Sequence, residues 1–285
     1  MSKVQVCDFS KVNFHQQFIG SIRNTGFAVI SNHGIDHNLI RQVQMDWKLF
    51  FLDDPKYKES FINREDPNLG YHGYKKEQAV GAKVPDLKEF FHWIPWRADS
   101  KIPSITANST QDLYVQLEDI GLELLNTLTK YQASHHNMPI RDYFSHCENS
   151  DKTLLRALYY PAVDLSREPG AVRAAAHEDI NYITLLVAAS SPGLEAKDNE
   201  GNWHAIPHEE NSIVVNIGDM MQLASKGFYK STTHRVVNPD NSNSDRISIP
   251  LFIHPHTDTV LDLDTGFTAG QYLNQRINQI YGDRK

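Results

Sequence analysis

The sequence has few cysteines and lacks both long apolar runs and long basic tracts. Its two cysteines, Cys7 and Cys147, are far apart, which excludes a disulfide framework and a cysteine-rich zinc site and favours a reducing cytoplasm. No window approaches the roughly 18 apolar residues that a membrane span needs, and residues 1–8 have no signal-peptide core. With a net charge of −7 and no basic tract, neither nucleic acid nor an anionic membrane is an expected partner.

The composition that is present is ordinary for a soluble globular protein. The chain has 285 residues, of which 40% are hydrophobic and 22% charged. This length is sufficient for a substantial core, either in one β-centred domain or in two smaller domains. We therefore expect a cytoplasmic protein that is a monomer or a weak dimer.

The first half of the sequence predicts helices and short strands around an irregular segment. Helical spacing of apolar residues predicts helices over residues 14–24, 39–51, 110–131 and 140–144. Asp36 is the expected cap of the second helix, and Ser109 or Thr110 that of the third. Residues 4–9 and 27–30 are strand-like. Residues 53–104 combine proline and glycine with aromatic and basic side chains, which indicates either a functional loop or a surface connection.

The second half changes to a period of two. After about Thr153, short apolar runs alternate with turn signals, and this pattern is typical of a β-sandwich or barrel. A last helix is expected over residues 268–281. No internal repeat is visible.

The segment Ala176-His177-Glu178-Asp179 carries the first chemical signal. In a strand, His177 and Asp179 would share one face, and Glu178 would lie on the other. They would then supply two of the three ligands of a 2-His-1-carboxylate site for ferrous iron. With 14 histidines and 35 acidic residues, such a pair can also arise by chance, so the segment alone does not establish a metal site.

Two later segments supply further candidates. His234 lies in a strand-like run and could be the third ligand, although a lone strand histidine is more often structural. In the run from Arg246 to Phe252, alternation places Arg246 and Ser248 on one face, where a guanidinium and a hydroxyl could bind a carboxylate. Taken alone, an edge strand with a solvent-facing polar side is the better interpretation of that run.

The order of the motifs decides between these alternatives. Tyr160-Pro161, His177-x-Asp179, Asn216-Ile217-Gly218-Asp219, His234-Arg235-Val236 and Arg246-x-Ser248 follow one another along the chain. At this point the sequence resembles the isopenicillin N synthase-like family of iron(II)/2-oxoglutarate-dependent dioxygenases. The block from Gly26 to Ile35 and the run Thr184-Leu185-Leu186 also resemble the family, and the likeness extends from about Val4 to about Tyr281.

The resemblance implies a mainly β protein with flanking helices and a double-stranded β-helix (jelly-roll) core. Residues 1–105 would form an N-terminal region that packs on a core of residues 106–285, in one compact unit. Iron(II) would be held by His177, Asp179 and His234. The distal carboxylate of 2-oxoglutarate would be bound by Arg246 and Ser248, with help from Tyr160. Dioxygen would be the second cosubstrate, and ascorbate would act as a supporting reductant.

The resemblance leaves the substrate and part of the reaction open. Oxidation of a small molecule could proceed as hydroxylation, desaturation or cyclisation. A cyclase of the isopenicillin N synthase type, which uses no 2-oxoglutarate, and a non-catalytic metal-binding jelly roll are the alternatives. The aromatic and basic residues around residues 68–97 suggest a carboxylate-bearing substrate, such as an amino acid. The candidate substrate-binding residues are Arg156, Tyr71, Tyr74, His92 and Phe252.

Overall fold

The computed structural model describes residues 3–76, 85–135, 141–162, 173–187, 189–237 and 244–281. The first residue of the helix expected over 140–144 lies outside these ranges, as do the two ends of the chain. None of the helices in the described ranges combines the length and the apolar character that a membrane crossing requires.

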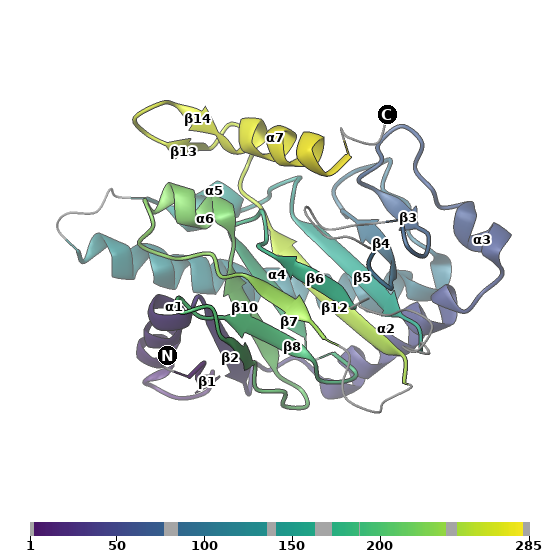
Figure 1. Ribbon diagram of the computed structural model, residues 1–285, viewed down its shortest axis with the longest axis horizontal. Coiled ribbons are helices and arrows are strands. Elements are labelled where there is room, and N and C mark those ends of the chain that lie inside the picture. Colours follow the sequence, from purple (N-terminus) through teal and green to yellow (C-terminus); the bar gives the residue numbers. More distant parts are fainter. Residues whose placement is uncertain are drawn as a thin grey trace.

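An eight-stranded sheet forms the centre of the molecule (Figure 1). In spatial order its strands are β1 (Val6–Asp8), β2 (Phe27–Ser31), β10 (Ile213–Ile217), β7 (Ile183–Val187), β12 (Arg246–Ile253), β5 (Leu154–Tyr160), β4 (Glu89–Trp93) and β3 (Gly70–His72). Both regions predicted from the sequence contribute to this sheet, because β1 to β4 lie within residues 1–105 and the other four strands lie beyond them.

A four-stranded sheet faces the first and completes a jelly-roll core. Its strands, in order, are β6 (Ala174–His177), β11 (His234–Val236), β8 (Leu194–Lys197) and β9 (Trp203–Ala205). A small cluster that includes Phe27, Val214 and Ala196 fills the space between the two sheets. A hairpin of β13 (Val260–Asp262) and β14 (Phe267–Thr268) lies apart from both.

The main hydrophobic core lies on the other face of the large sheet, beneath the helices. It joins Ile247, Ile249 and Leu251 of β12 to apolar side chains of the long helices. Figure 1 shows the longest helix behind the sheets. The helices are α1 (Phe14–Thr25), α2 (His37–Phe51), α3 (Pro55–Glu59), α4 (Ser104–Ala133), α5 (Tyr143–Cys147), α6 (Asp219–Ala224) and α7 (Ala269–Tyr281).

The helix predictions were right in kind but wrong at two boundaries, since the helix expected over 140–144 is α5 (Tyr143–Cys147) and α4 starts earlier than expected. Asp36 caps α2 as predicted, since its side chain accepts from Asn38 N. However, α4 begins at Ser104, with Pro103 at the cap position and no side-chain cap. Ser109 and Thr110 lie inside the helix, where Ser109 donates to Asp46 and Thr110 accepts from Trp47.

Two strand interpretations also need correction. The possibility that Arg246 to Phe252 forms an edge strand is wrong, because β12 pairs with β7 on one side and β5 on the other. The expectation that one strand carries both His177 and Asp179 is also wrong. β6 ends at His177, where its partner β11 begins.

Candidate metal centre and cosubstrate site

The two candidate histidine ligands meet as a cross-strand pair. His177 ends β6 and His234 begins β11, and the two residues are direct partners in the antiparallel ladder, with ring centroids 4.4 Å apart. Each Nδ1 lies against a backbone carbonyl, His177 on Ala175 at 2.8 Å and His234 on Thr232 at 3.1 Å. A carbonyl can only accept, so each Nδ1 carries a proton and each Nε2 is the ring nitrogen that can face a metal ion.

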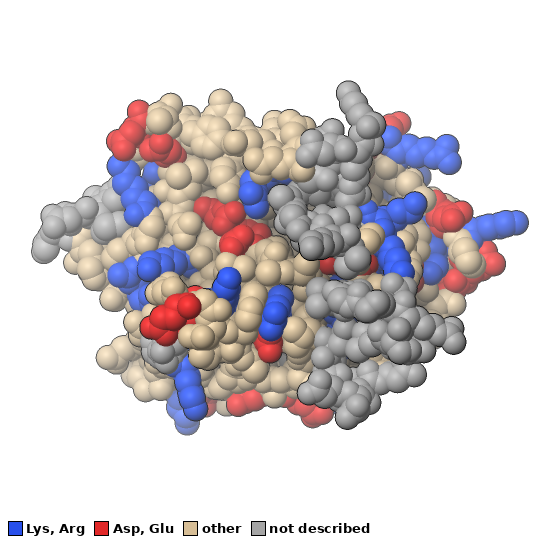
Figure 2. All heavy atoms as spheres, in the orientation of Figure 1, with Lys and Arg blue, Asp and Glu red and all other residues tan. Residues whose placement is uncertain are grey.

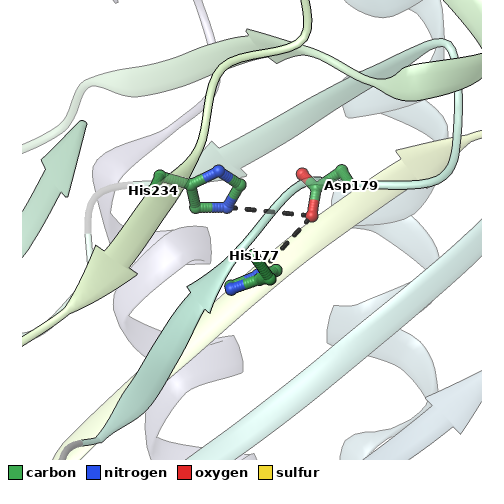
Figure 3. A group of neighbouring side chains, drawn as sticks. All are labelled: His177, Asp179 and His234. Atoms are coloured by element: carbon green, nitrogen blue, oxygen red, sulfur yellow. Dashed lines mark ion pairs between the residues drawn. The ribbon is translucent and has the colours of Figure 1, made fainter. Parts of the chain in front are cut away.

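Asp179 brings a carboxylate oxygen to the same point from the loop after β6. Its Oδ1 lies 3.8 Å from each histidine Nε2, and the three potential ligand atoms all lie within 4.8 Å of one another. Figure 3 shows the three side chains converging from two strands and a loop. The structure therefore brings together the three residues that the sequence singled out.

The other oxygen of Asp179 is held by the protein. Asp179 Oδ2 accepts from Thr184 Oγ1 at 2.5 Å and from Asn216 Nδ2 at 2.8 Å. Sequence reasoning assigned no role to Thr184 or Asn216, although both lie in the motifs that carried the resemblance. Such supporting bonds orient a ligand and tune its basicity.

The protonation states suit a metal ion. Burial lowers the pKa of His177 to about 4, and the neighbouring His234 adds to this effect. Burial raises the pKa of Asp179, but the two histidines and the bonds from Asn216 and Thr184 outweigh it and hold that pKa below its ordinary value. At neutral pH His177 is neutral and Asp179 is ionised, as ligation requires. Two nitrogens and one oxygen on one side of a site match the ligand set of non-haem iron(II) oxygenases.

Glu178 is not part of this group of ligand atoms. Its carboxylate accepts a hydrogen bond from Thr233, the residue before His234. The carboxylate is therefore engaged by the protein, in keeping with the expectation that Glu178 is not a ligand.

Arg246 and its neighbours form a buried cationic site on adjacent strands. Arg246 lies opposite Tyr160 of β5, and Ser248 lies opposite Leu158. The guanidinium of Arg246 donates to Pro192 O at 2.9 Å, but its buried Nε has no partner. Burial lowers the pKa of Arg246 to about 10, so it stays charged at neutral pH. No ion pair to Arg246 exists among the described residues. An uncompensated buried cation is costly, so this site fits a carboxylate ligand.

A cavity of about 590 Å³ opens beside His177 and Asp179. Three of the predicted substrate-binding residues, Arg156, His92 and Phe252, line it. Arg156 Nε donates to His92 Nε2 at 2.5 Å, and its guanidinium carbon lies 5.8 Å from the centroid of the Phe252 ring. These contacts fix a guanidinium at the wall of the cavity.

The other two predicted substrate-binding residues do not line this cavity. Tyr71 is 7% exposed, and its hydroxyl donates to Glu89, which also pairs with Lys58. Tyr74 is half-exposed beside Lys75. Instead, the structure adds residues that the sequence did not suggest, including the buried His254 and Leu273, Asn274 and Ile277 of α7. The amphipathic pattern of α7 was visible, but its position over the cavity was not.

The molecular surface carries mixed charge. On the face shown in Figure 2, the basic and acidic side chains of the described residues are interspersed, without a continuous basic patch.

Two family models match different parts of the chain. One family model, described as the 2OG-Fe(II) oxygenase superfamily, matches residues 152–255. A second, described as non-haem dioxygenase in morphine synthesis N-terminal, matches residues 4–112. The chain is 30% identical to the proline hydroxylase buaE of Petromyces alliaceus, over 94% of this chain and 93% of that relative.

Solved structures with the same fold cover nearly the whole chain. A candidate oxygenase of Shewanella oneidensis shares 37% identity with a TM-score of 0.84, covering 97% of this chain and 98% of its own. A full-length protein of Neurospora crassa, solved in complex with alpha-KG, shares 25% identity with a TM-score of 0.80, covering 95% of this chain and 94% of its own.

Proposed function

The chain belongs to the 2OG-Fe(II) oxygenase superfamily, and from this premise we propose that it oxidises a small carboxylate-bearing molecule, such as an amino acid, in the cavity beside His177 and Asp179. It is an iron(II)- and 2-oxoglutarate-dependent dioxygenase. When bound, iron and 2-oxoglutarate supply the oxidising chemistry, in which decarboxylation of the cosubstrate is coupled to oxidation of the substrate. Within the superfamily we propose the isopenicillin N synthase-like branch, because the order of the motifs resembles that branch from about Val4 to about Tyr281.

In this proposal His177, Asp179 and His234 hold the metal ion. The bonds to Ala175 and Thr232 keep both Nε2 atoms aimed at it, while Thr184 and Asn216 keep Asp179 Oδ1 free for it. Arg246 and Ser248 hold the distal carboxylate of 2-oxoglutarate, and Tyr160 lies opposite Arg246 in the neighbouring strand. The unpartnered Nε of the buried Arg246 supports this placement.

The position of Arg156 carries the proposal about the substrate. Its guanidinium is on the cavity wall, oriented by His92 and stacked 4.4 Å from the centroid of Phe90. A planar guanidinium fixed in this way suits a substrate carboxylate, which it can bind with two parallel hydrogen bonds. The relative named a proline hydroxylase supports an amino acid as the substrate class.

The first experiment is a screen of amino acids and small carboxylic acids for succinate formation. We expect at least one of them to raise succinate production in step with its own oxidation. Substrate oxidation without succinate would instead indicate an oxidative cyclase that does not consume 2-oxoglutarate. If no carboxylate raised succinate formation but a neutral compound did, the proposed substrate class would be refuted.

Replacement of Arg156 tests the proposed contact directly. In Arg156→Gln we expect KM for the carboxylate substrate to rise about 10- to 100-fold, the effect of losing a charge-assisted bond. Affinity for 2-oxoglutarate should not change. The matched control is Arg97→Gln, because Arg97 also lines the cavity and its guanidinium is held by Asp66 and Asp99. An equal rise in KM in both variants would contradict a specific role for Arg156.

A further inference from the structure

A second buried guanidinium lies close to that of Arg246. Arg173, immediately before β6, is only 2% exposed. Its Nη1 donates to Ser191 Oγ at 3.3 Å and its Nη2 to Ser244 O at 2.5 Å, but its buried Nε has no partner. No carboxylate forms an ion pair with Arg173 in the part of the chain that the structure describes. Its hydrogen-bond partners among the described residues are therefore neutral oxygens.

The two guanidiniums are anchored on consecutive residues of one loop. Arg173 binds Ser191, and Arg246 binds the carbonyl of Pro192. Each cation also interacts electrostatically with Tyr160, and the charge of Arg173 lowers the pKa of Arg246 further. These shared neighbours bring Arg173 and Arg246 together at the loop that carries Ser191 and Pro192.

Two like charges in one buried site are unfavourable without an anion. Asp245 acts electrostatically on Arg173, but its carboxylate is bound to Lys48 at 2.7 Å and to the hydroxyl of Tyr159 at 3.4 Å. An isolated buried charge is unfavourable, and repulsion between two such charges adds to that cost. A bound carboxylate would offset both the cost of burial and the repulsion, and it could also accept hydrogen bonds from the two unpartnered Nε atoms.

We propose that Arg173 is a second cation of the cosubstrate site, so that the distal carboxylate of 2-oxoglutarate is held jointly by Arg173 and Arg246. This inference rests on the proposed binding of that carboxylate by Arg246. Arg173 is a binding residue in this account and takes no part in the oxidation itself. This role explains why the chain has a buried arginine immediately before β6, the strand that ends in His177.

The test compares two ligands that differ only at the distal end. Binding of 2-oxoglutarate and of 2-oxopentanoate, which has a methyl group in place of the distal carboxylate, is measured by calorimetry on protein loaded with Mn(II). We expect Arg173→Gln to lower the affinity for 2-oxoglutarate about 10- to 100-fold and to leave the affinity for 2-oxopentanoate unchanged. Arg246→Gln should also lower the affinity for 2-oxoglutarate alone, and by at least as large a factor.

Arg141→Gln is the matched structural control. Arg141 is also buried with an unpartnered Nε, but both its Nη atoms donate to backbone carbonyls of Val260 and Leu261, away from this site. Its replacement should lower the melting temperature without changing the preference for 2-oxoglutarate. If Arg173→Gln does not fold, Arg173→Lys takes its place, with a smaller selective loss expected.

The outcomes separate the inference from the proposed function. In one outcome the Arg173 variants lower the affinity for both ligands equally, or for neither, while Arg246→Gln lowers only the affinity for 2-oxoglutarate. Arg173 is then structural, and only this inference fails. If Arg246→Gln also leaves the preference intact, the proposed placement of 2-oxoglutarate fails with it.

Discussion

Asp179 shows how a single residue can serve both the metal and the fold. One oxygen lies 3.8 Å from each histidine Nε2, and the other accepts from Thr184 and Asn216. Thr184 and Asn216 are themselves direct partners in the ladder between β7 and β10. The pairing of two core strands therefore fixes the orientation of a ligand that lies in a loop.

Replacement of Asn216 should weaken the metal site without unfolding the protein. In Asn216→Ala the carboxylate of Asp179 loses one of its two supporting bonds, and we expect a roughly 10- to 100-fold loss of Fe(II) affinity. Anaerobic Fe(II) titration measures this change. Asn202→Ala is the control, because Asn202 supports only Asp198 in the β8–β9 turn. Equal Fe(II) affinity in wild type and Asn216→Ala would show that this bond does not matter.

At the level of single residues, the order of motifs was enough to find the three candidate ligands. It was not enough to find their supports, because Asn216 and Thr184 acquire their role only through strand register. His254 was missed for a related reason. Its position at the cavity depends on where β12 ends relative to the metal site.

Among the elements, the turn between β10 and α6 is packed directly against the loop that carries Asp179. The amide of Asp219 donates to Asp179 O at 2.7 Å, and the amide of Gly218 donates to Tyr182 O at 2.9 Å. A Cβ at Gly218 would lie 2.2 Å from the backbone oxygen of Asn181. This close approach explains a motif that, read alone, is an ordinary strand–turn signal.

Gly218→Ala should therefore disturb stability and the metal site together. The added methyl group must push the loop of Asn181 away, at a cost of about 1–3 kcal/mol, and Asp179 moves with that loop. We expect a lower urea midpoint and weaker Fe(II) binding. Gly20→Ala is the control variant. Gly20 lies in α1, and a Cβ there would meet only the end of the Gln5 side chain, at 4.0 Å. If Gly218→Ala matched Gly20→Ala in both measurements, the packing argument would be wrong.

The segment of residues 53–104 was the least predictable part of the fold. It contains β4, whose residues are all buried between β3 and β5. The aromatic run from Phe90 to Trp93, bounded by Pro85 and Pro95, is a strand signal that the surrounding loop residues hid. The early start of α4 was also hard to predict, because Pro103 lies at the cap position without a side-chain cap, one residue before the position that proline favours.

Across the whole molecule, several buried histidines make folding sensitive to acid. Burial lowers the pKa of His254 to about 4 and also lowers that of His33 and His146 below the ordinary value. In the unfolded chain a histidine has a pKa near 6.5. Between about pH 6.5 and 4 the unfolded state binds protons that the folded state does not, so stability falls as the pH falls through this window.

His254 allows this effect to be isolated. Unfolding by urea in the presence of EDTA is measured for wild type and His254→Gln between pH 7 and 5. Both proteins lose the free energy linked to the other buried histidines, but only wild type loses the part linked to His254, so we expect its stability relative to the variant to fall by about 2 kcal/mol over this range. A difference between the two proteins that does not change with pH would mean that His254 is not held neutral by burial.

The central claim is that the whole fold assembles one iron site from His177, Asp179 and His234, with 2-oxoglutarate bound beside it. Anaerobic addition of Fe(II) and then 2-oxoglutarate, followed by visible absorption, tests this claim most directly. We expect a weak charge-transfer band that saturates at one iron per chain and disappears in Asp179→Ala and His234→Ala. No band in wild type, or a band that persists in both variants, would contradict the account.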